Sequence, residues 1–293
     1  MIDKASWRGT RLGSSPILLD GAIGTELSRR GVRLPDVAWS AAAIESAAET
    51  IAAIHREYAA AGAEVHTATT FRTTRNRVGQ SARELTKLAV ELARENVDRR
   101  GVVFGSVGPM SDCYRRQRVS PSALSHYQDH VDDLVAANVD GILCETFAEP
   151  DDAVAAASVA TRTNLPVWVS LTAGYRGELM TTDEFILAAK RLFEIGASCV
   201  LLNCVAVRLV EPFLDAIDSL RFHGRFGIYA NAGTTIDDVH WTWTAGVDDP
   251  ASYAAAAKVW LDRGASVVGG CCGTTPEHIA AVHCDCFRDD PDH

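Results

Sequence analysis

The sequence has little lysine, no long apolar run and no excess of positive charge. Its 28 basic residues include only four lysines, and its 38 acidic residues give a net charge of −10. This balance excludes a nucleic-acid surface, which needs a concentrated excess of positive charge. No apolar run approaches the roughly 20 residues that cross a bilayer, and the opening MIDKASWRGTRLG contains no apolar signal core. We therefore expect a soluble, cytoplasmic protein.

Short apolar runs recur along the whole chain, each one after a turn signal. We predict eight strands, at 17–20, 64–70, 102–108, 141–146, 167–172, 199–204, 227–231 and 266–272. Their interiors are almost continuously apolar, as in strands that are buried on both faces of a parallel sheet.

Alanine-rich stretches of helical length alternate with these strands. We predict helices at 41–61, 81–100, 121–137, 150–163, 182–195, 209–220, 250–263 and 276–284. Four helix ends carry a residue that suits a left-handed cap: Gly62, Asn138, Gly196 and Gly264. The alternation predicts an α/β fold of the (β/α)8 TIM-barrel type, as one domain over residues 1–293 with short tails. An open doubly wound sheet is the alternative, but DGAIG at 20–24 is not its GxGxxG loop.

Polar residues collect at the carboxyl ends of the predicted strands, where the chemistry of such barrels is placed. In chain order they are Asp20, Thr69, Thr70, Ser106, Glu145, Thr146, Ser170, Thr172, Asn203, Cys204, Asn231, Cys271 and Cys272. A barrel without a site needs neither carboxylates nor thiols at this rim.

Three of the eight cysteines belong to this set, Cys204 after the sixth strand and Cys271 and Cys272 after the eighth. Adjacent strands lie about 4.8 Å apart, so these ends are roughly 10 Å apart and their side chains can share one ion. Glycines at 269, 270 and 273 let the backbone bend so that both neighbouring cysteines face one centre. The alternatives are a buried apolar thiol at 204 and a chance pair or vicinal disulfide at 271–272. We assign no role to the other cysteines, Cys113, Cys144, Cys199, Cys284 and Cys286.

Three thiolates leave one position of a tetrahedral zinc ion open, which is the pattern of a catalytic site. They cancel more than the charge of Zn²⁺, so the ion activates water poorly but suits a fourth sulfur as ligand. This ligand set predicts a zinc centre that presents a substrate thiolate as a nucleophile. A zinc hydrolase, or a barrel that binds zinc or thiols without turnover, is the alternative.

Several motifs run through nearly the whole chain in order. They are LLDGAIGTEL at 18–27, TTF at 69–71, SVGP at 106–109, ET at 145–146, WVSLT at 168–172, LLNC at 201–204, YANAG at 229–233 and GGCCGTTPEHI at 269–279. In these motifs the sequence resembles the homocysteine S-methyltransferase family. This family includes S-methylmethionine– and betaine–homocysteine methyltransferases and the homocysteine domain of cobalamin-dependent methionine synthase.

The resemblance implies a Zn²⁺ cofactor with Cys204, Cys271 and Cys272 as its ligands and the sulfur of homocysteine as the fourth. The implied reaction is attack of this thiolate on an electrophilic methyl group, which gives methionine. The resemblance also implies substrate-binding roles. Asp20 and Glu145 would hold the ammonium group of homocysteine, and the amides around Gly21 and Ala22 would hold its carboxylate.

The residues alone leave other roles open for the substrate-binding set. Asp20 could cap the following turn, and Glu145 could pair with an arginine. We expect Ser170 to contact substrate, and Asn203 and Asn231 to orient the thiolates or the substrate unless they only form turns.

The methyl donor is less well defined. Because the chain ends soon after its predicted eighth helix, without cobalamin or folate modules, we expect a free sulfonium donor, S-methylmethionine or S-adenosylmethionine. However, GPMSDCYRRQRVSP at 108–121, VAV at 205–207 and YANAG at 229–233 depart from the usual family pattern. A betaine-like donor, a methyl group on a corrinoid protein partner and another thiol acceptor therefore stay open.

Two further features lie near the predicted mouth. Arginines there could bind an anionic substrate or a docking partner, or lie in solvated loops; they are Arg72, Arg75, Arg77, Arg115, Arg116 and Arg118. The HWTW sequence at 240–243 could form a wall of the donor pocket or pack on the rim.

Overall fold

A computed structural model describes residues 15–35, 37–98, 101–110, 112–219, 224–233, 235–237, 242–245 and 248–287. Eight parallel strands form one sheet in the order β1-β10-β7-β6-β5-β4-β3-β2. They are β1 (Ile17–Leu18), β2 (Val65–Ala68), β3 (Val102–Val107), β4 (Gly141–Phe147), β5 (Val167–Leu171), β6 (Cys199–Ala206), β7 (Phe226–Asn231) and β10 (Val267–Val268). A parallel bridge between Leu19 and Val65 joins the two edges, so the sheet closes on itself. The (β/α)8 barrel and all eight predicted strands are confirmed.

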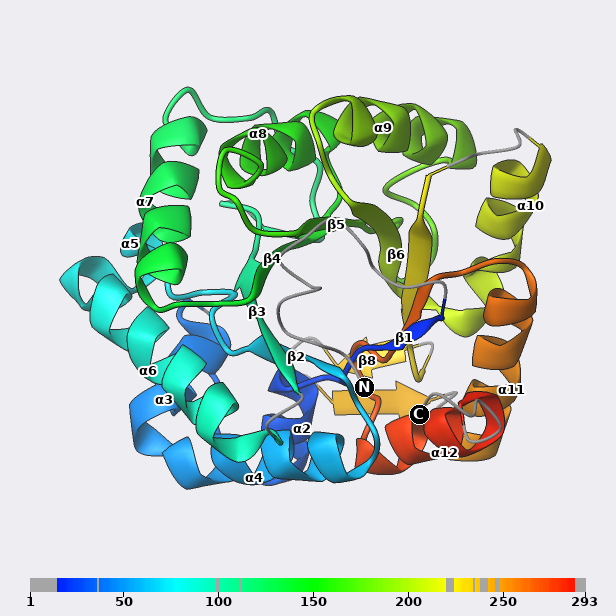
Figure 1. The fold of residues 1–293 in the computed structure, drawn as a ribbon, viewed down its shortest axis with the longest axis horizontal. Helices are drawn as coiled ribbons and strands as arrows, with labels where there is room; N and C mark the ends of the chain where they lie inside the picture. Colours follow the sequence, from blue (N-terminus) through cyan, green and yellow to red (C-terminus); the bar gives the residue numbers. More distant parts are fainter. Residues whose placement is uncertain are drawn as a thin grey trace.

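A ring of helices surrounds the strands (Figure 1). It consists of α4 (Ala48–Ala60), α6 (Ala82–Asn96), α7 (Ala123–Ala136), α8 (Pro150–Ala160), α9 (Thr182–Glu194), α10 (Glu211–Ser219), α11 (Pro250–Asp262) and α12 (Pro276–Cys286). Their ends follow local chemistry: Thr181 and Glu184 form a capping box before α9, and Asp249 accepts two amide hydrogen bonds at the start of α11. The predicted helix ends have positive φ, 98° at Gly62, 61° at Asn138, 101° at Gly196 and 89° at Gly264.

Shorter elements complete the fold. They are α2 (Gly24–Arg29), η1 (Trp39–Ala42), α3 (Ala43–Ser46), α5 (Arg75–Val78), η2 (Gly79–Ser81), η3 (Val207–Leu209) and the hairpin of β8 (Thr235–Asp237) and β9 (Thr242–Ala245). The single helix predicted at 41–61 is wrong at Ala47, where φ of −138° separates α3 from α4. No glycine or proline marks this break, so apolar periodicity could not find it.

An apolar plug fills the inside of the barrel. It consists of Ile17, Leu19, Val65, Val102, Phe104, Leu143, Trp168, Cys199, Leu201, Tyr229 and Val267. The rings of Phe104 and Trp168 lie 4.7 Å apart between centroids, and both are fully buried. A second apolar layer lies between the strands and the helices. Among the described residues, no helix is both long enough and apolar enough to cross a membrane.

Candidate active site

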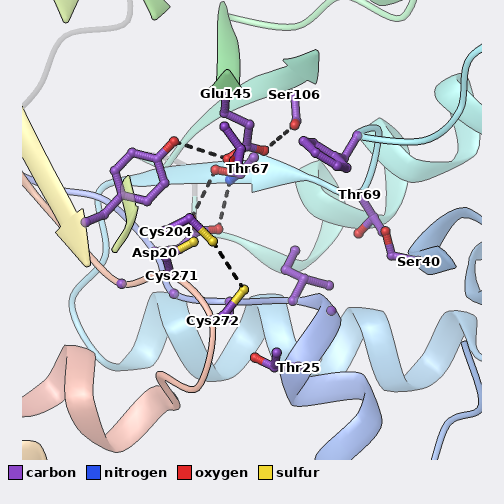
Figure 2. Close-up of a pocket in the computed structure, with 18 of the residues that line it drawn as sticks. Asp20, Thr25, Ser40, Thr67, Thr69, Ser106, Glu145, Cys204, Cys271 and Cys272 are labelled. Carbon is purple, nitrogen blue, oxygen red and sulfur yellow. Dashed lines mark hydrogen bonds between the residues drawn. The ribbon is translucent and has the colours of Figure 1, made fainter. Parts of the chain in front are cut away.

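A cavity opens at the carboxyl ends of the strands, with an empty volume of about 970 Å³ that includes its mouth. Among the residues that the sequence singled out, its wall contains both predicted carboxylates and all three predicted metal ligands: Asp20, Glu145, Cys204, Cys271 and Cys272. Figure 2 shows these side chains converging from different strands. The carboxyl ends of barrel strands therefore supply this site, as in other enzymes of this fold.

The three predicted cysteines lie together. Their sulfurs are all within 4.8 Å of one another, and those of Cys204 and Cys272 are 3.8 Å apart. Zn–S bonds of about 2.3 Å in a tetrahedron separate two sulfurs by about 3.8 Å, so the spacing fits zinc. The trio is therefore a candidate metal centre of the predicted kind.

Unusual backbone conformations build this arrangement. Among the described residues, four that are not glycine have positive φ, and three of these line the cavity: Trp39 (43°), Thr146 (67°) and Cys204 (53°). After the vicinal pair, Gly273 has φ of 81°, a conformation that favours glycine. Strain of this kind collects at functional sites, where the surrounding structure must hold it in place.

The three thiols differ in acidity. Hydrogen bonds from Cys204 and Cys271 hold the pKa of Cys272 well below its ordinary value. Hydrogen bonds to the other two sulfurs, together with burial, raise the pKa of Cys204. Hydrogen bonds among the three sulfurs therefore favour a thiolate within the trio.

A tyrosine that the sequence did not single out also reaches this cluster. The hydroxyl of Tyr114 lies 2.9 Å from the sulfur of Cys204, and its ring lies 4.2 Å from that of Tyr175. Burial raises the pKa of Tyr114, so the phenol stays protonated and can donate to a thiolate. Tyr114 belongs to the segment after β3 whose sequence departs from the family pattern, and nothing in that sequence indicated a contact with the thiols.

Asp20 is held by one residue of β2. The amide of Thr67 donates to its Oδ2 at 2.8 Å, and the hydroxyl of Thr67 donates to its Oδ1 at 3.1 Å. Burial nevertheless raises the pKa of Asp20 well above its ordinary value. The carboxylate of Asp20 accepts its hydrogen bonds from Thr67 of β2 and not from the turn that follows Asp20. Asp20 is therefore not the cap of that turn.

Glu145 is held by Ser106, whose hydroxyl donates to its Oε1, and by Tyr229, whose hydroxyl donates to Oε2 at 3.2 Å. Burial raises the pKa of Glu145 to about 7, although both hydrogen bonds oppose this rise. In the described part of the chain, neither Glu145 nor Asp20 forms an ion pair with a basic side chain. A buried carboxylate and a half-buried one in the same cavity, both without a basic partner, create a preference for a positively charged ligand.

The remaining predicted substrate residues lie at different depths. Gly21 and Ala22 line the cavity, where the amide of Ala22 already donates to the hydroxyl of Thr274 at 3.2 Å. The other three, Ser170, Asn203 and Asn231, are fully buried and are not part of the cavity wall.

The two asparagines differ in their contacts. The Nδ2 of Asn203 donates to the hydroxyl of Thr146 at 2.9 Å and lies 3.7 Å from the sulfur of Cys271. Asn203 therefore lies behind a cysteine, in a position to orient it. Neither polar side-chain atom of Asn231 has a hydrogen-bond partner among the described residues.

The other cysteines are dispersed. Cys113 is buried and lines the cavity, and burial raises its pKa to about 12. Cys144 and Cys199 are buried, Cys286 is half-buried and Cys284 is exposed.

The arginines also take different positions. Arg72 lines the cavity, with its guanidinium 4.9 Å from the ring centroid of Phe71. Arg116 instead pairs with Glu149 and Glu184, and Arg75 with Asp133. Of the HWTW sequence, His240 and Trp241 lie outside the described residues.

The fold and site together define a class of protein, a (β/α)8-barrel enzyme whose rim combines three thiols with two carboxylates. The profile of the homocysteine S-methyltransferase family matches residues 17–286, and the chain belongs to this family. The resemblance found in the sequence is thereby confirmed. The chain is a methyltransferase, and methyl transfer to homocysteine is the activity that its family supports.

Individual members of the family align with this chain over nearly their whole length. The homocysteine S-methyltransferase of Escherichia coli (strain K12) is 30% identical, with 91% of this chain and 94% of that protein covered. The homocysteine S-methyltransferase YbgG of Bacillus subtilis (strain 168) is 27% identical, with 91% and 93% covered. The crystal structure of the metallated form of the homocysteine methyltransferase MmuM from Escherichia coli has a TM-score of 0.74 at 26% identity, with 92% of this chain and 96% of that chain covered.

Proposed function

We propose that this chain transfers a methyl group from S-methylmethionine or S-adenosylmethionine to homocysteine, with Zn²⁺ bound by Cys204, Cys271 and Cys272. The observation that carries this proposal is the convergence of three sulfurs at zinc-like spacing. It is supported by two carboxylates in the same cavity wall, buried Asp20 and half-buried Glu145, which have no basic partners among the described residues.

Zinc bound by the trio would lower the pKa of a fourth, substrate thiol and leave it electron-rich enough to act as a nucleophile. The protein's own residues then fix the rest of the substrate. Asp20 and Glu145 pair with the ammonium group of homocysteine, which supplies the positive partner that their desolvated carboxylates lack. The amide of Gly21 lies in the same wall and suits the substrate carboxylate.

Methyl transfer itself is an in-line displacement. The homocysteine sulfur forms a bond to the methyl carbon while the bond between this carbon and the donor sulfur breaks. The electron pair of the broken bond returns to the donor, which leaves as a neutral thioether, and the product is methionine. The protein's contribution is alignment of the two reactants in a cavity that is closed below by the apolar plug.

The donor side of the cavity suits a sulfonium ion. Trp39, Phe71 and Tyr114 line it, and aromatic faces attract cations. Arg72 lies in the same wall and matches the carboxylate of an amino-acid donor such as S-methylmethionine. No feature of the described residues favours the corrinoid protein that the sequence left open as a partner.

A donor panel tests this proposal. The zinc-loaded chain is incubated with homocysteine and, in turn, S-methylmethionine, S-adenosylmethionine, betaine and methylcobalamin. The products are identified by mass spectrometry. We expect methionine with a sulfonium donor and none without zinc. Full zinc occupancy without methyl transfer to a thiol would contradict the proposal, and zinc release by homocysteine without methionine would favour a binding protein. If methionine forms only with betaine or only with methylcobalamin, that compound is the donor and the proposed sulfonium donor is wrong.

A further inference from the structure

Two histidines lie beside Asp20 and have no part in the reaction proposed above. His55 belongs to α4 and His66 to β2, and both side chains are fully buried. One nitrogen of each ring and one oxygen of Asp20 lie within 4.8 Å of one another. The loop after β1, helix α4 and strand β2 therefore bring a carboxylate and two imidazoles close together.

Among the described residues, three of the four ring nitrogens of these histidines have no hydrogen-bond partner. The Nε2 of His66 lies 3.1 Å from the carbonyl oxygen of Ala63, which can only accept, so Nε2 carries the hydrogen. The Nδ1 of His66 and both nitrogens of His55 have no hydrogen-bond partner among the described residues. A ring nitrogen that donates to a backbone carbonyl while the other faces a ligand is the usual arrangement of a metal-binding histidine.

Burial keeps both rings neutral. It lowers the pKa of His55 to about 3 and that of His66 to about 4. Neutral imidazole is the form that binds metal ions. The buried histidine His278 offers no ring nitrogen to a metal in this way, because its two nitrogens contact Thr275 and the carbonyl oxygen of Asp248.

We propose that His55, His66 and Asp20 form a second metal site, distinct from the three cysteines, that takes a divalent transition-metal ion such as Zn²⁺ or Co²⁺. Two imidazoles and one carboxylate favour such an ion over Mg²⁺ and Ca²⁺, which prefer oxygen ligands. Asp20 accepts two hydrogen bonds from Thr67, and its oxygens retain lone pairs for a metal.

The shared carboxylate makes this site regulatory. This step rests on the proposed function, in which Asp20 pairs with the ammonium group of homocysteine. A divalent cation on Asp20 removes the negative charge that the ammonium group needs, so metal and homocysteine weaken each other's binding. Linkage requires the same factor in both directions, and couplings of this kind amount to about 5- to 150-fold. Excess metal therefore inhibits the enzyme through this site.

Titration of the full-length, metal-free protein with Co²⁺ tests the site. We expect two equivalents per chain. The first gives the thiolate-to-cobalt charge-transfer band of the cysteine trio, and the second gives d–d bands without further charge transfer. In His66→Leu we expect one equivalent, with the charge-transfer band retained. The matched control is His130→Leu, which removes another buried histidine that contacts a backbone carbonyl, and it should keep two equivalents.

Three results would overturn the second site: one equivalent in the wild-type protein, a second equivalent that survives His66→Leu, or a loss of it in His130→Leu as well. If His66→Leu does not fold, anomalous scattering from cobalt-soaked wild-type crystals decides between a metal and a buried water beside the two rings. Homocysteine should weaken only the second equivalent. A His66-dependent second equivalent in a protein without methyl transfer would leave this site standing while the proposed function fails.

Discussion

Strand β6 carries two buried cysteines, five positions apart, whose surroundings are opposite. Cys199 lies in the apolar plug at the beginning of the strand, where burial raises its pKa to about 12. Cys204 lies near the end of the strand with a positive φ, 2.9 Å from the hydroxyl of Tyr114 and 3.8 Å from the sulfur of Cys272. The same side chain is inert at one end of the barrel and a candidate metal ligand at the other. Position along the strand, and not residue type, decides which.

The comparison extends to the two ends of the whole barrel. The plug contains rings and aliphatic side chains that gain free energy from burial. The rim contains the carboxylates of Asp20 and Glu145, whose pKa values are raised by desolvation, so that their charged forms are less stable there than in water. The plug therefore stabilises the fold, whereas the carboxylates of the rim reduce its stability and are available to bind a ligand.

The largest contrast is expected between two identical substitutions on β6. Cys204→Ala removes one of the three sulfurs, and we expect methyl transfer to fall about a thousandfold, because a metal centre supplies several kcal/mol of transition-state stabilisation. Cys199→Ala should leave activity unchanged and reduce the free energy of unfolding by about 1 kcal/mol. Steady-state kinetics and bound-zinc analysis of both variants measure this contrast. Equal loss of activity in the two variants would contradict it.

Trp168→Ala disturbs the plug without touching the rim. Trp168 is fully buried against Phe104, and removal of such a ring reduces the free energy of unfolding by about 3–5 kcal/mol. Urea denaturation measures this loss. At temperatures where the variant stays folded, its zinc content should equal that of the wild-type protein. A variant of normal stability that has lost zinc would reverse the roles assigned to the two ends.

Much of this fold could be predicted from the sequence, because its main signals are local. The apolar runs of the eight strands and the caps Gly62, Gly196 and Gly264 each depend on a few neighbouring residues. The break at Ala47 and the short helix α2 carry no such signal and were missed. Local signals thus defined the barrel but not its irregular connections.

The site was predictable only in part for the same reason. Strand ends placed Cys204, Cys271 and Cys272 at one rim, because the parallel strands of a barrel all end on one side. Their partners were not predictable: the contact between Tyr114 and Cys204 joins residues 90 positions apart, and that between Tyr229 and Glu145 joins residues 84 apart. Side-chain contacts of this range depend on register and rotamer, which a single sequence does not report.

Glu145→Gln tests the charge at the rim. Loss of one charged hydrogen bond costs about 1.5–3 kcal/mol, so we expect the Kd for homocysteine to rise about 10- to 100-fold. Asp152→Asn is the matched control, because Asp152 is a buried carboxylate that bonds to Tyr127 and is not part of the cavity wall. It should leave this Kd unchanged, and an equal rise in both variants would argue against an ammonium site.

The raised pKa of Glu145 adds a pH dependence to the same interaction. The charged form of Glu145 binds ammonium, and its pKa is about 7. Binding of the product methionine, which has no thiol to titrate, should therefore weaken as the pH falls below about 7. In Glu145→Gln this part of the pH dependence should be absent. Calorimetric titration at several pH values measures both curves, and identical curves would show that another group titrates.

The smallest effect is expected from Tyr114→Phe, which keeps the ring and removes only the hydroxyl beside Cys204. This hydroxyl also lowers the pKa of Cys272 through a hydrogen bond. Without it the sulfurs hold their protons more tightly, and zinc must compete with these protons to bind. We therefore expect zinc affinity at neutral pH to fall about 2- to 10-fold, the equivalent of one hydrogen bond of 0.5–1.5 kcal/mol. Tyr175→Phe keeps the contact between the two rings and the Tyr114 hydroxyl, so it is the matched control in a competition with a zinc chelator. If Tyr114→Phe binds zinc as tightly as the control, the phenol contributes packing alone, and the acidity of the rim depends on the three sulfurs themselves.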